Sequence, residues 1–368
     1  MCSSDLLRRT LDPTVREQPR PPIHVQAGHG VLSFRDMNQI ILTKKIILAA
    51  LGVCFAGTTL LVHAATPAFT SAADWLKLPE GRPTLGNMHG DIAVSAKGEV
   101  YVSVQDPQAG LQVFAPDGTF LRNVPGAPSD LHGFVIHRDA GGEFLYGVTL
   151  RGQTIVKMAL DGTVAMTIPA LAIPDEFKVR NARSGQLGVL LTGLDVAPNG
   201  DLYVADGYAS DYIHRFDHMG KYLTSFGGKK PPYNFNTLHK LAIDTRFQPA
   251  RIIACDRANN RVLHLSLDGQ LLGVVAQDLL LPAAIVVSGD YAIVGELKGQ
   301  VSILDKTGAV VSRFGTNTEP GAGTNQLKPE QWRAGIFTAP HGVAINERGD
   351  LFVSEFNQYG RVLRFNRQ

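Results

Sequence analysis

The chain has 368 residues, of which 44% are hydrophobic, and its 35 Lys and Arg side chains are balanced by 33 Asp and Glu. This length and apolar fraction allow a sizeable buried core, and the charge balance argues against a nucleic-acid-binding protein, which would normally carry a basic stripe. The 38 glycines and 21 prolines suit short strands joined by tight turns. The cysteines Cys2, Cys54 and Cys255 are too few for a disulfide scaffold or a cysteine-based zinc site.

The first 65 residues have the features of a targeting region rather than of a folded domain. Residues 1–36 are polar, rich in Arg and Pro and without periodicity, and we interpret them as a disordered extension or as the product of a misassigned start codon. In residues 37–65, Lys44 and Lys45 precede an uncharged apolar run that ends in small residues, which is typical of a secretory signal peptide. The segment predicts an exported protein, periplasmic or secreted. The alternative is an uncleaved anchor helix, which would contact a membrane.

Residues 66–368 contain a repeated unit. The repeat is clearest at 91–103, 193–206 and 342–355, which read DIAVSAKGEVYVS, GLDVAPNGDLYVAD and GVAINERGDLFVSE. Each unit shows the period-2 alternation and the glycine-containing turns of four short strands. Aligned on their first strand, the six units begin at Gly90, His132, Thr192, His239, Ala283 and His341.

Four-stranded units of this length, present six times, predict an all-β fold, a six-bladed β-propeller over residues 66–368. One such sheet cannot bury both of its faces, whereas radially stacked sheets cover one another. The last unit ends with the chain, just after its third strand, and propellers complete such a blade with a strand from the other terminus, which removes an open edge. We expect residues 74–78 to form this closing strand and to pair with residues 361–365.

Histidine occupies the first position of the innermost strand in every second unit. His132, His239 and His341 hold it in units 2, 4 and 6, and small residues hold it elsewhere. This strand lines the channel of a propeller, and alternate blades are related by about 120°, so the three imidazoles can converge on one ion at a channel mouth. Three neutral His with an open fourth position are the pattern of a catalytic zinc site, although Fe, Mn and Cu also accept imidazole. His89, one residue off the register, and His137, inside its strand, are interpreted as structural.

Further polar residues follow the second strand, whose end lies at the same mouth because it runs antiparallel to the first. Tyr208 and Arg257 should project over the mouth, where Tyr can act as an acid or base and Arg can bind a carboxylate. Carboxylates that end this strand either tie the next loop, with Arg261 and Arg361 as partners, or orient metal-bound imidazoles from behind. These carboxylates are Asp206, Asp256, Glu296 and Glu355.

The repeat pattern resembles the NHL repeat, a six-bladed propeller class, and the residues of the mouth resemble the peptidyl-hydroxyglycine amidating lyases. The matching segments here are 131–134 (LHGF), 204–208 (VADGY), 238–241 (LHKL), 255–259 (CDRAN) and 340–343 (PHGV). The resemblance implies a zinc ion held by His132, His239 and His341. It also implies Tyr208 and Arg257 as catalytic residues, and cleavage of a hydroxyglycine C–N bond to give an amide and glyoxylate.

The chain departs from that family around the expected substrate. Ala339 and Gly342 stand where the family has a Met and an Asp beside the third His, and Gln105 and Asp106 stand near the place of an active-site Arg. The metal ligands, the tyrosine and one arginine therefore match, whereas half of the expected substrate contacts do not. The substrate and the identity of the divalent metal stay open.

Two other functions also stay open. A non-catalytic propeller would bind a partner protein or a ligand at the same mouth, with the long segments 173–191 and 316–338 as contact surface or as lids. A calcium-dependent, lactonase-like propeller would use oxygen ligands on the axis, which the three imidazoles disfavour, although a structural Ca²⁺ held by channel carbonyls is compatible with the sequence. The expected partner is a small molecule, a peptide or a protein, and not a nucleic acid.

Overall fold

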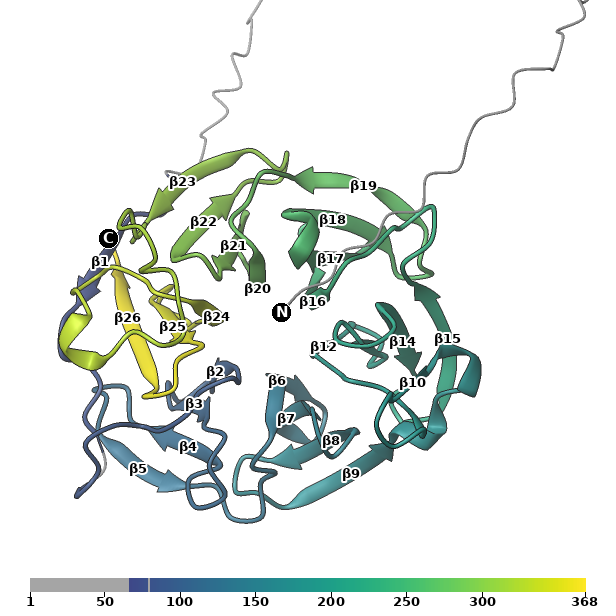
Figure 1. Cartoon of the computed structure of the whole chain (residues 1–368), viewed down its shortest axis with the longest axis horizontal. Helices are drawn as coiled ribbons and strands as arrows, with labels where there is room; N and C mark the ends of the chain where they lie inside the picture. Colours follow the sequence, from purple (N-terminus) through teal and green to yellow (C-terminus); the bar gives the residue numbers. More distant parts are fainter. Residues whose placement is uncertain (1–65, 79) are drawn as a thin grey trace, which may run out of the picture. The chain divides into compact units, whose positions relative to one another are not determined.

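The computed structural model describes residues 66–78 and 80–368, so the expectations for residues 1–65, including the signal peptide, lie outside the described residues. The described chain forms six four-stranded antiparallel sheets and one short hairpin. The six sheets are arranged radially around a central channel (Figure 1). The predicted six-bladed β-propeller is confirmed.

The first three blades follow one another along the chain, and each starts with its innermost strand. Blade 1 contains β2 (Ile92–Val94), β3 (Val100–Ser103), β4 (Leu111–Phe114) and β5 (Phe120–Asn123). Blade 2 contains β6 (Leu131–Asp139), β7 (Gly142–Thr149), β8 (Thr154–Ala159) and β9 (Val164–Pro169). Blade 3 contains β12 (Gly193–Val196), β13 (Leu202–Ala205), β14 (Tyr212–Phe216) and β15 (Tyr222–Gly227).

The other three blades complete the ring. Blade 4 contains β16 (Leu238–Asp244), β17 (Arg251–Asp256), β18 (Arg261–Ser266) and β19 (Leu271–Ala276). Blade 5 contains β20 (Pro282–Ser288), β21 (Tyr291–Glu296), β22 (Gln300–Leu304) and β23 (Val310–Phe314). Blade 6 contains β24 (Pro340–Ile345), β25 (Leu351–Glu355) and β26 (Arg361–Arg367), with β1 (Phe69–Ala72) as its outer strand.

The remaining elements lie in two long connections between blades and in one short turn of blade 4. The connection between blades 2 and 3 holds the 3₁₀ turns η1 (Ala170–Ala172) and η2 (Asp175–Phe177) and the hairpin of β10 (Val179–Arg180) and β11 (Leu187–Gly188). The 3₁₀ turn η3 (Arg257–Asn259) follows β17, and η4 (Pro329–Gln331) lies in the connection between blades 5 and 6. No helix among the described residues is long and apolar enough to cross a membrane.

The hydrophobic core lies between neighbouring blades. Tyr101 and Leu111 of blade 1 pack with Leu131 and Phe134 of blade 2, and each of these side chains is almost fully buried. Since burying a large apolar side chain contributes about 1.5–3 kcal/mol, each blade depends on its neighbours for most of its stability. Cys255 is part of another such core cluster and is a free, buried thiol.

The ring is closed by an N-terminal strand, as expected, but the residues predicted for it are wrong. Strand β1 (Phe69–Ala72) pairs with residues 364–367 of β26, whereas residues 74–78 do not join the sheet. Trp75 is buried instead, with its ring edge on Phe352 at 5.2 Å and its Nε1 donating to the Pro116 carbonyl. Trp75 therefore packs between blades 1 and 6 and does not belong to a strand.

Candidate metal centre

A β-bulge places each of the three predicted histidines at the channel mouth. In β6 the pairing with β7 jumps from Leu131 to Gly133, which leaves His132 outside the ladder. The same shift leaves out His239 in β16 and His341 in β24. A bulged residue is unpaired and its side chain is re-aimed relative to the strand. The alignment register that identified these histidines therefore corresponds to a repeated backbone irregularity.

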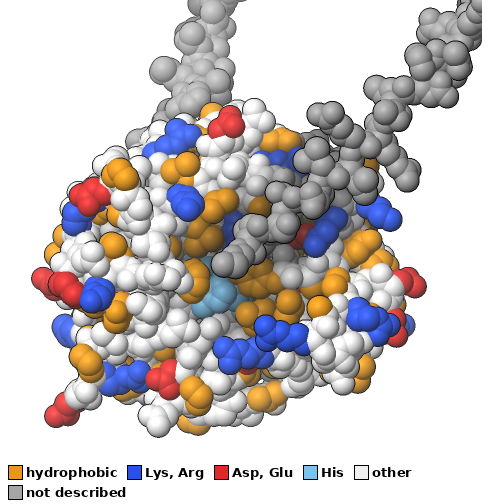
Figure 2. All heavy atoms as spheres, in the orientation of Figure 1, with side chains coloured by type: hydrophobic (Ala, Val, Ile, Leu, Met, Phe, Trp, Pro, Cys, Tyr) orange, Lys and Arg blue, Asp and Glu red, His pale blue; other side chains and the backbone are white. Residues whose placement is uncertain are grey.

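The three imidazoles lie together at the mouth. Their ring centroids are 4.8–5.2 Å apart in all three pairs, and all three side chains are at least 97% buried. Figure 2 shows histidine side chains in a central hollow on one face of the propeller, bordered by hydrophobic groups. The sequence-based expectation that His132, His239 and His341 face one another across the axis agrees with this arrangement.

Each imidazole is held by a backbone carbonyl of the next blade. Nδ1 of His132 lies 2.7 Å from the Thr192 oxygen, and Nδ1 of His239 lies 2.6 Å from the Ala283 oxygen. Nδ1 of His341 lies 3.1 Å from the carbonyl oxygen of Gly90.

Carbonyl oxygens only accept hydrogen bonds, so each of these imidazoles carries its proton on Nδ1, and Nε2 is a lone pair available to a metal. Thr192, Ala283 and Gly90 hold the equivalent position in the alternate units. Their role here is to orient the imidazoles through their carbonyls.

The converging Nε2 atoms have fewer proton donors than they need. The Tyr208 hydroxyl lies 2.9 Å from Nε2 of His239 and 3.3 Å from Nε2 of His132, but its single proton can serve only one of them. Nε2 of His341 is buried and has no hydrogen-bond partner among the described residues. A buried acceptor without a donor is costly. A divalent cation would satisfy these lone pairs together, so the residues present fit a metal.

The charge state of the imidazoles also suits metal binding. Burial lowers the pKa of His132 to about 3, with a further contribution from His89. Burial and the Arg257 guanidinium lower the pKa of His239, and burial and the neighbouring imidazoles lower that of His341, both well below the ordinary value. The imidazoles are therefore neutral at pH 7, which is the form that binds metals.

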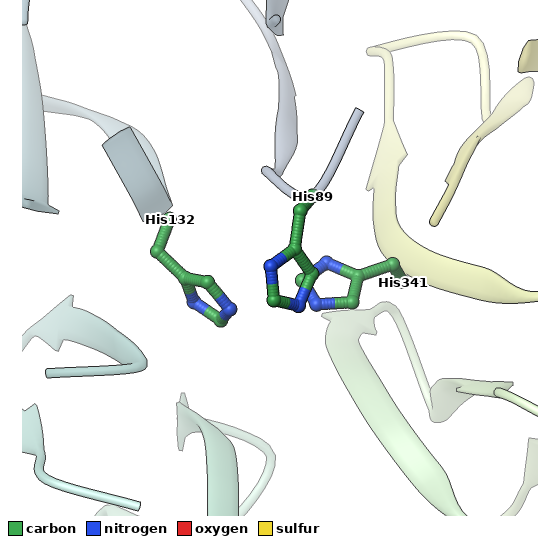
Figure 3. A group of neighbouring side chains, drawn as sticks. All are labelled: His89, His132 and His341. Carbon is green, nitrogen blue, oxygen red and sulfur yellow. The ribbon is translucent and has the colours of Figure 1, made fainter. Parts of the chain in front are cut away.

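The structure adds an imidazole that the sequence alignment set aside, and His239 is not part of the group of neighbouring ligand nitrogens that it joins. The nitrogens of His89, His132 and His341 that could bind a metal lie within 4.8 Å of one another, and the three rings approach each other at the mouth (Figure 3). His89 is partly buried, and burial and Arg257 lower its pKa to about 4. The interpretation of His89 as a structural residue does not fit this position, whereas His137 contacts the Tyr146 ring, away from the cluster.

Tyr208 and Arg257 reach the mouth as the sequence predicted. Besides its contacts with His239 and His132, the Tyr208 hydroxyl lies 3.2 Å from Nε2 of His89. It also accepts a hydrogen bond of 3.2 Å from Nη1 of Arg257. Burial raises the pKa of this hydroxyl, and the Arg257 charge opposes the rise in part. The mouth therefore contains four imidazoles, one phenol and one guanidinium.

Comparison with known proteins supports the sequence-based resemblance. No protein-family model matches the chain. The curated peptidyl-alpha-hydroxyglycine alpha-amidating lyase 1 of Drosophila melanogaster is 27% identical over 220 residues, which cover 51% of the chain. The chain resembles an amidating lyase. The match spans only 37% of the fly protein.

Solved structures similar to the chain are propellers of several kinds. A virginiamycin B lyase from Staphylococcus aureus matches with a TM-score of 0.53 and 12% identity, covering 82% of the chain and 99% of that protein. A gluconolactonase from Xanthomonas campestris matches with a TM-score of 0.55 and 14% identity, covering 83% of the chain and 99% of that protein. At these identities the likeness establishes the fold alone.

The four carboxylates at the ends of the second strands tie the loops that follow or precede the mouth strands. Asp206 accepts from the backbone N–H of Leu190, and Asp256 accepts from that of Asn236. Glu296 and Glu355 accept from the equivalent loops at residues 280 and 338. The expected partners Arg261 and Arg361 bind Asp256 and Glu355. The alternative, that these carboxylates orient the imidazoles directly, is wrong because the Nδ1 partners are backbone carbonyls.

An ion pair crosses the channel, and its lysine directly follows one of the three register histidines in the sequence. Nζ of Lys240, which follows His239, binds the carboxylate of Asp91 in blade 1, and both side chains are buried. The backbone N–H of Phe134 in blade 2 also donates to Asp91. Gly342 lies where a Cβ would be 2.5 Å from the Asp91 carboxylate. The Asp91 carboxylate thus connects blade 1 to blade 4 through Lys240 and to blade 2 through the backbone of Phe134.

A cavity of about 360 Å³ adjoins the site behind Tyr208. The β10–β11 hairpin forms one of its walls, with Val179, Leu187 and Leu190 among its lining residues. These three side chains are 38–43% exposed, and Lys229 lies at the same cavity. Tyr208 thus borders both the imidazole cluster and a partly apolar cavity of the kind that holds the body of a ligand.

Proposed function

We propose that the chain is a metal-dependent lyase that cleaves the C–N bond of an N-acyl-α-hydroxyglycine, such as a peptide that ends in hydroxyglycine. The main support is the convergence of three carbonyl-anchored imidazoles, with unsatisfied Nε2 lone pairs, beside Tyr208 and Arg257. The sequence similarity to an amidating lyase supports the same reaction. Zn²⁺ is the metal we expect, since neutral imidazoles with room for a further ligand are typical of catalytic zinc.

The reaction converts R–CO–NH–CH(OH)–COO⁻ into the amide R–CO–NH₂ and glyoxylate, OHC–COO⁻. The O–H bond and the C–N bond break, the hydroxyl carbon becomes an aldehyde, and the hydroxyl proton ends on the leaving nitrogen. Because one proton moves from oxygen to nitrogen, a single acid–base group can carry it. A divalent cation, when bound, supplies Lewis-acid polarisation and lowers the pKa of hydroxyl groups near it.

Tyr208 is the group that we assign to the proton transfer. Its hydroxyl lies among the imidazoles, and the Nη1 hydrogen bond from Arg257 favours the phenolate form. Without a metal, burial holds the Tyr208 pKa above its usual value, so Tyr208 would become a base only in the metal-loaded protein. Arg257 offers a planar pair of donors for the substrate carboxylate.

A glyoxylate-release assay with N-benzoyl-α-hydroxyglycine tests this proposal. The full chain is stripped with a chelator and reloaded with Zn²⁺, and we expect glyoxylate only after reloading. His341→Ala should lose both the metal and the activity, whereas His137→Ala is the matched control, because His137 lies outside the cluster. Zn²⁺-loaded protein without any glyoxylate release would contradict the proposed reaction.

A non-catalytic binding propeller is the second candidate. The exposed apolar residues Val179, Leu187 and Leu190 at the cavity behind Tyr208 favour it, since exposed apolar groups gathered at a concave site are typical of binding surfaces. Under this hypothesis ligand binding at the mouth would not depend on a metal. Equal ligand affinity in the wild-type chain and in His341→Ala would favour it over the lyase.

We also propose that the protein is exported, through residues 37–65. The support is the charge and hydropathy pattern of that segment alone. N-terminal sequencing of the mature protein should give a start within a few residues of Ala65. A mature protein that retains residues 37–65 would contradict the cleavage and favour an anchor helix.

A further inference from the structure

The mouth holds one imidazole more than the alignment of the repeats predicts, and this residue has a different origin from the others. His89 comes from the segment that leads into blade 1, one residue before the register position at Gly90. It is fixed there by non-local contacts, because the adjacent Met88 forms a bridge with Asn357 of blade 6. The backbone carbonyl of His89 accepts a hydrogen bond of 3.2 Å from the Gln105 side chain.

The ring of His89 lies directly against two of the carbonyl-anchored imidazoles. Its centroid is 4.9 Å from that of His132 and 4.9 Å from that of His341. The His89 ring also packs on the Phe356 ring, with the centroids 4.3 Å apart, which restricts its rotation. The candidate ligand nitrogens of His89, His132 and His341 lie within 4.8 Å of one another, which makes the three imidazoles candidates for binding one ion.

One difference separates His89 from the other three. Nδ1 of His132, His239 and His341 is held by a carbonyl, whereas the only polar contact recorded for the His89 ring within the described residues is to the Tyr208 hydroxyl. His89 is also the one member of the four that is partly exposed. A ligand whose second nitrogen is not anchored is less well oriented than an anchored one.

We propose that His89 is a fourth imidazole ligand of the metal centre, and that it gives up its coordination position when a substrate carboxylate or hydroxyl binds. The inference rests on the proposed metal site, and it goes further by assigning the position that a three-imidazole site leaves open. Three anchored imidazoles form the permanent part of the site. When a metal is bound, His89 would supply the fourth nitrogen in the resting protein, since zinc sites usually have four ligands.

With His89 as fourth ligand, the resting site would have no coordination position open to substrate. A substrate must then displace His89, so its binding energy is partly spent on opening the site. The displaced imidazole would stay close to the Tyr208 hydroxyl, since these groups are already 3.2 Å apart.

The test compares the full-length wild-type chain with His89→Ala and His89→Gln, with His137→Ala as the control. X-ray absorption counts the imidazoles on bound Zn²⁺, and competition with a chromophoric chelator measures its affinity. We expect four imidazoles in the wild type and in the control, three in both His89 variants, and an affinity reduced by roughly ten- to a hundredfold in those variants. Using two variants guards against a folding defect in either one.

A second measurement addresses the displacement. Glycolate, a small hydroxy acid, should lower the imidazole count of the wild type from four to three and change the visible spectrum of the Co²⁺-substituted protein. In His89→Ala the count should stay at three when glycolate is added. An unchanged count in the wild type on glycolate addition would overturn the displacement.

The outcomes separate this inference from the proposed function. If both His89 variants keep the wild-type affinity and imidazole count while His341→Ala loses the metal, the role of His89 is overturned and the metal site stands. If both His89 variants bind Zn²⁺ more weakly and with one imidazole fewer, while His341→Ala loses the metal, His89 is supported as a fourth ligand. Absence of Zn²⁺ binding by the wild-type chain would overturn both the metal site and the role of His89.

Discussion

The Tyr208 hydroxyl lies 2.9 Å from Nε2 of His239, although the two residues belong to different blades. Because the Nδ1 proton of His239 is committed to the Ala283 carbonyl, this Nε2 can only accept, and the hydroxyl must be the donor. The phenol is thus tied to a candidate metal ligand rather than to solvent.

Tyr208→Phe should separate catalysis from metal binding. The substitution removes the hydroxyl and keeps the ring, so the imidazoles keep their carbonyl partners and the metal affinity should change little. Loss of a positioned acid–base group typically costs about 10²- to 10⁴-fold in rate, and we expect kcat for glyoxylate release to fall by that order. A variant with wild-type kcat would remove Tyr208 from the reaction.

Lys240→Met should destabilise the propeller strongly. It leaves the buried carboxylate of Asp91 without its cation, and breaking a buried ion pair in this way costs about 3–5 kcal/mol. The double variant Asp91→Asn, Lys240→Met should recover part of that loss, because no unpaired charge is left. Denaturant unfolding measures both values.

A control for this experiment is Lys77→Ala, which breaks an ion pair with Asp117 at the surface. Exposed pairs contribute little to stability, so its unfolding midpoint should match the wild type. A Lys240→Met variant as stable as Lys77→Ala would show that the pair across the channel has no structural role.

The stability of the metal-free protein should fall in mild acid. The unfolded chain binds a proton on each imidazole near pH 6.5, whereas burial lowers the pKa of His89 to about 4 and that of His132 to about 3 in the folded protein. Below pH 6.5 the unfolded state therefore binds more protons, and the free energy of unfolding falls as pH drops toward 4. Each such imidazole adds about 1.4 kcal/mol per pH unit to the slope.

Chelator-treated protein, unfolded with denaturant at several pH values, tests this slope. His132→Gln removes one of the titrating groups and should make the pH dependence shallower. Stability that is constant between pH 6.5 and pH 4.5 would show that the imidazoles are not neutral and buried in solution.

Leu187→Asp should impair substrate binding more than the chemical step. Leu187 lines the cavity behind Tyr208 and is 38% exposed, so a carboxylate there would disfavour an apolar acyl group without touching the imidazoles. We expect KM for N-acyl-α-hydroxyglycines with large apolar acyl groups to rise about tenfold, the effect of about 1.4 kcal/mol, with kcat nearly unchanged. Leu171→Asp is the control, because Leu171 is 86% exposed and lies outside the cavity lining. Equal KM values in the two variants would exclude the cavity as the acyl site.

The blades and the three register histidines could be predicted from the sequence because both depend on patterns within each repeated unit. Alternation of apolar residues and glycine-containing turns recur in each unit, and a common alignment position becomes a common position around the axis. The bulges at His132, His239 and His341 preserve that register. The presence of Tyr208 and Arg257 at the mouth follows from the same strand geometry.

Features that depend on distant segments could not be predicted. The closing strand Phe69–Ala72 has little apolar alternation, whereas the nearby Trp75 is a stronger signal that serves packing against Phe352. His89 joins the cluster because blade 6 fixes the segment before it. The carbonyls that orient the imidazoles belong to neighbouring blades. The Lys240 and Asp91 pair joins residues 149 positions apart.

Metal analysis of the purified full-length protein is the most direct test of the account. After dialysis against Zn²⁺ and removal of the excess, the wild-type chain should retain about one equivalent of metal per chain, as expected for one cluster of imidazoles. The triple variant His132→Ala, His239→Ala, His341→Ala should retain none while keeping the circular dichroism of a β-sheet protein. A wild-type chain without bound metal, or a triple variant with the same metal content, would contradict the proposed centre.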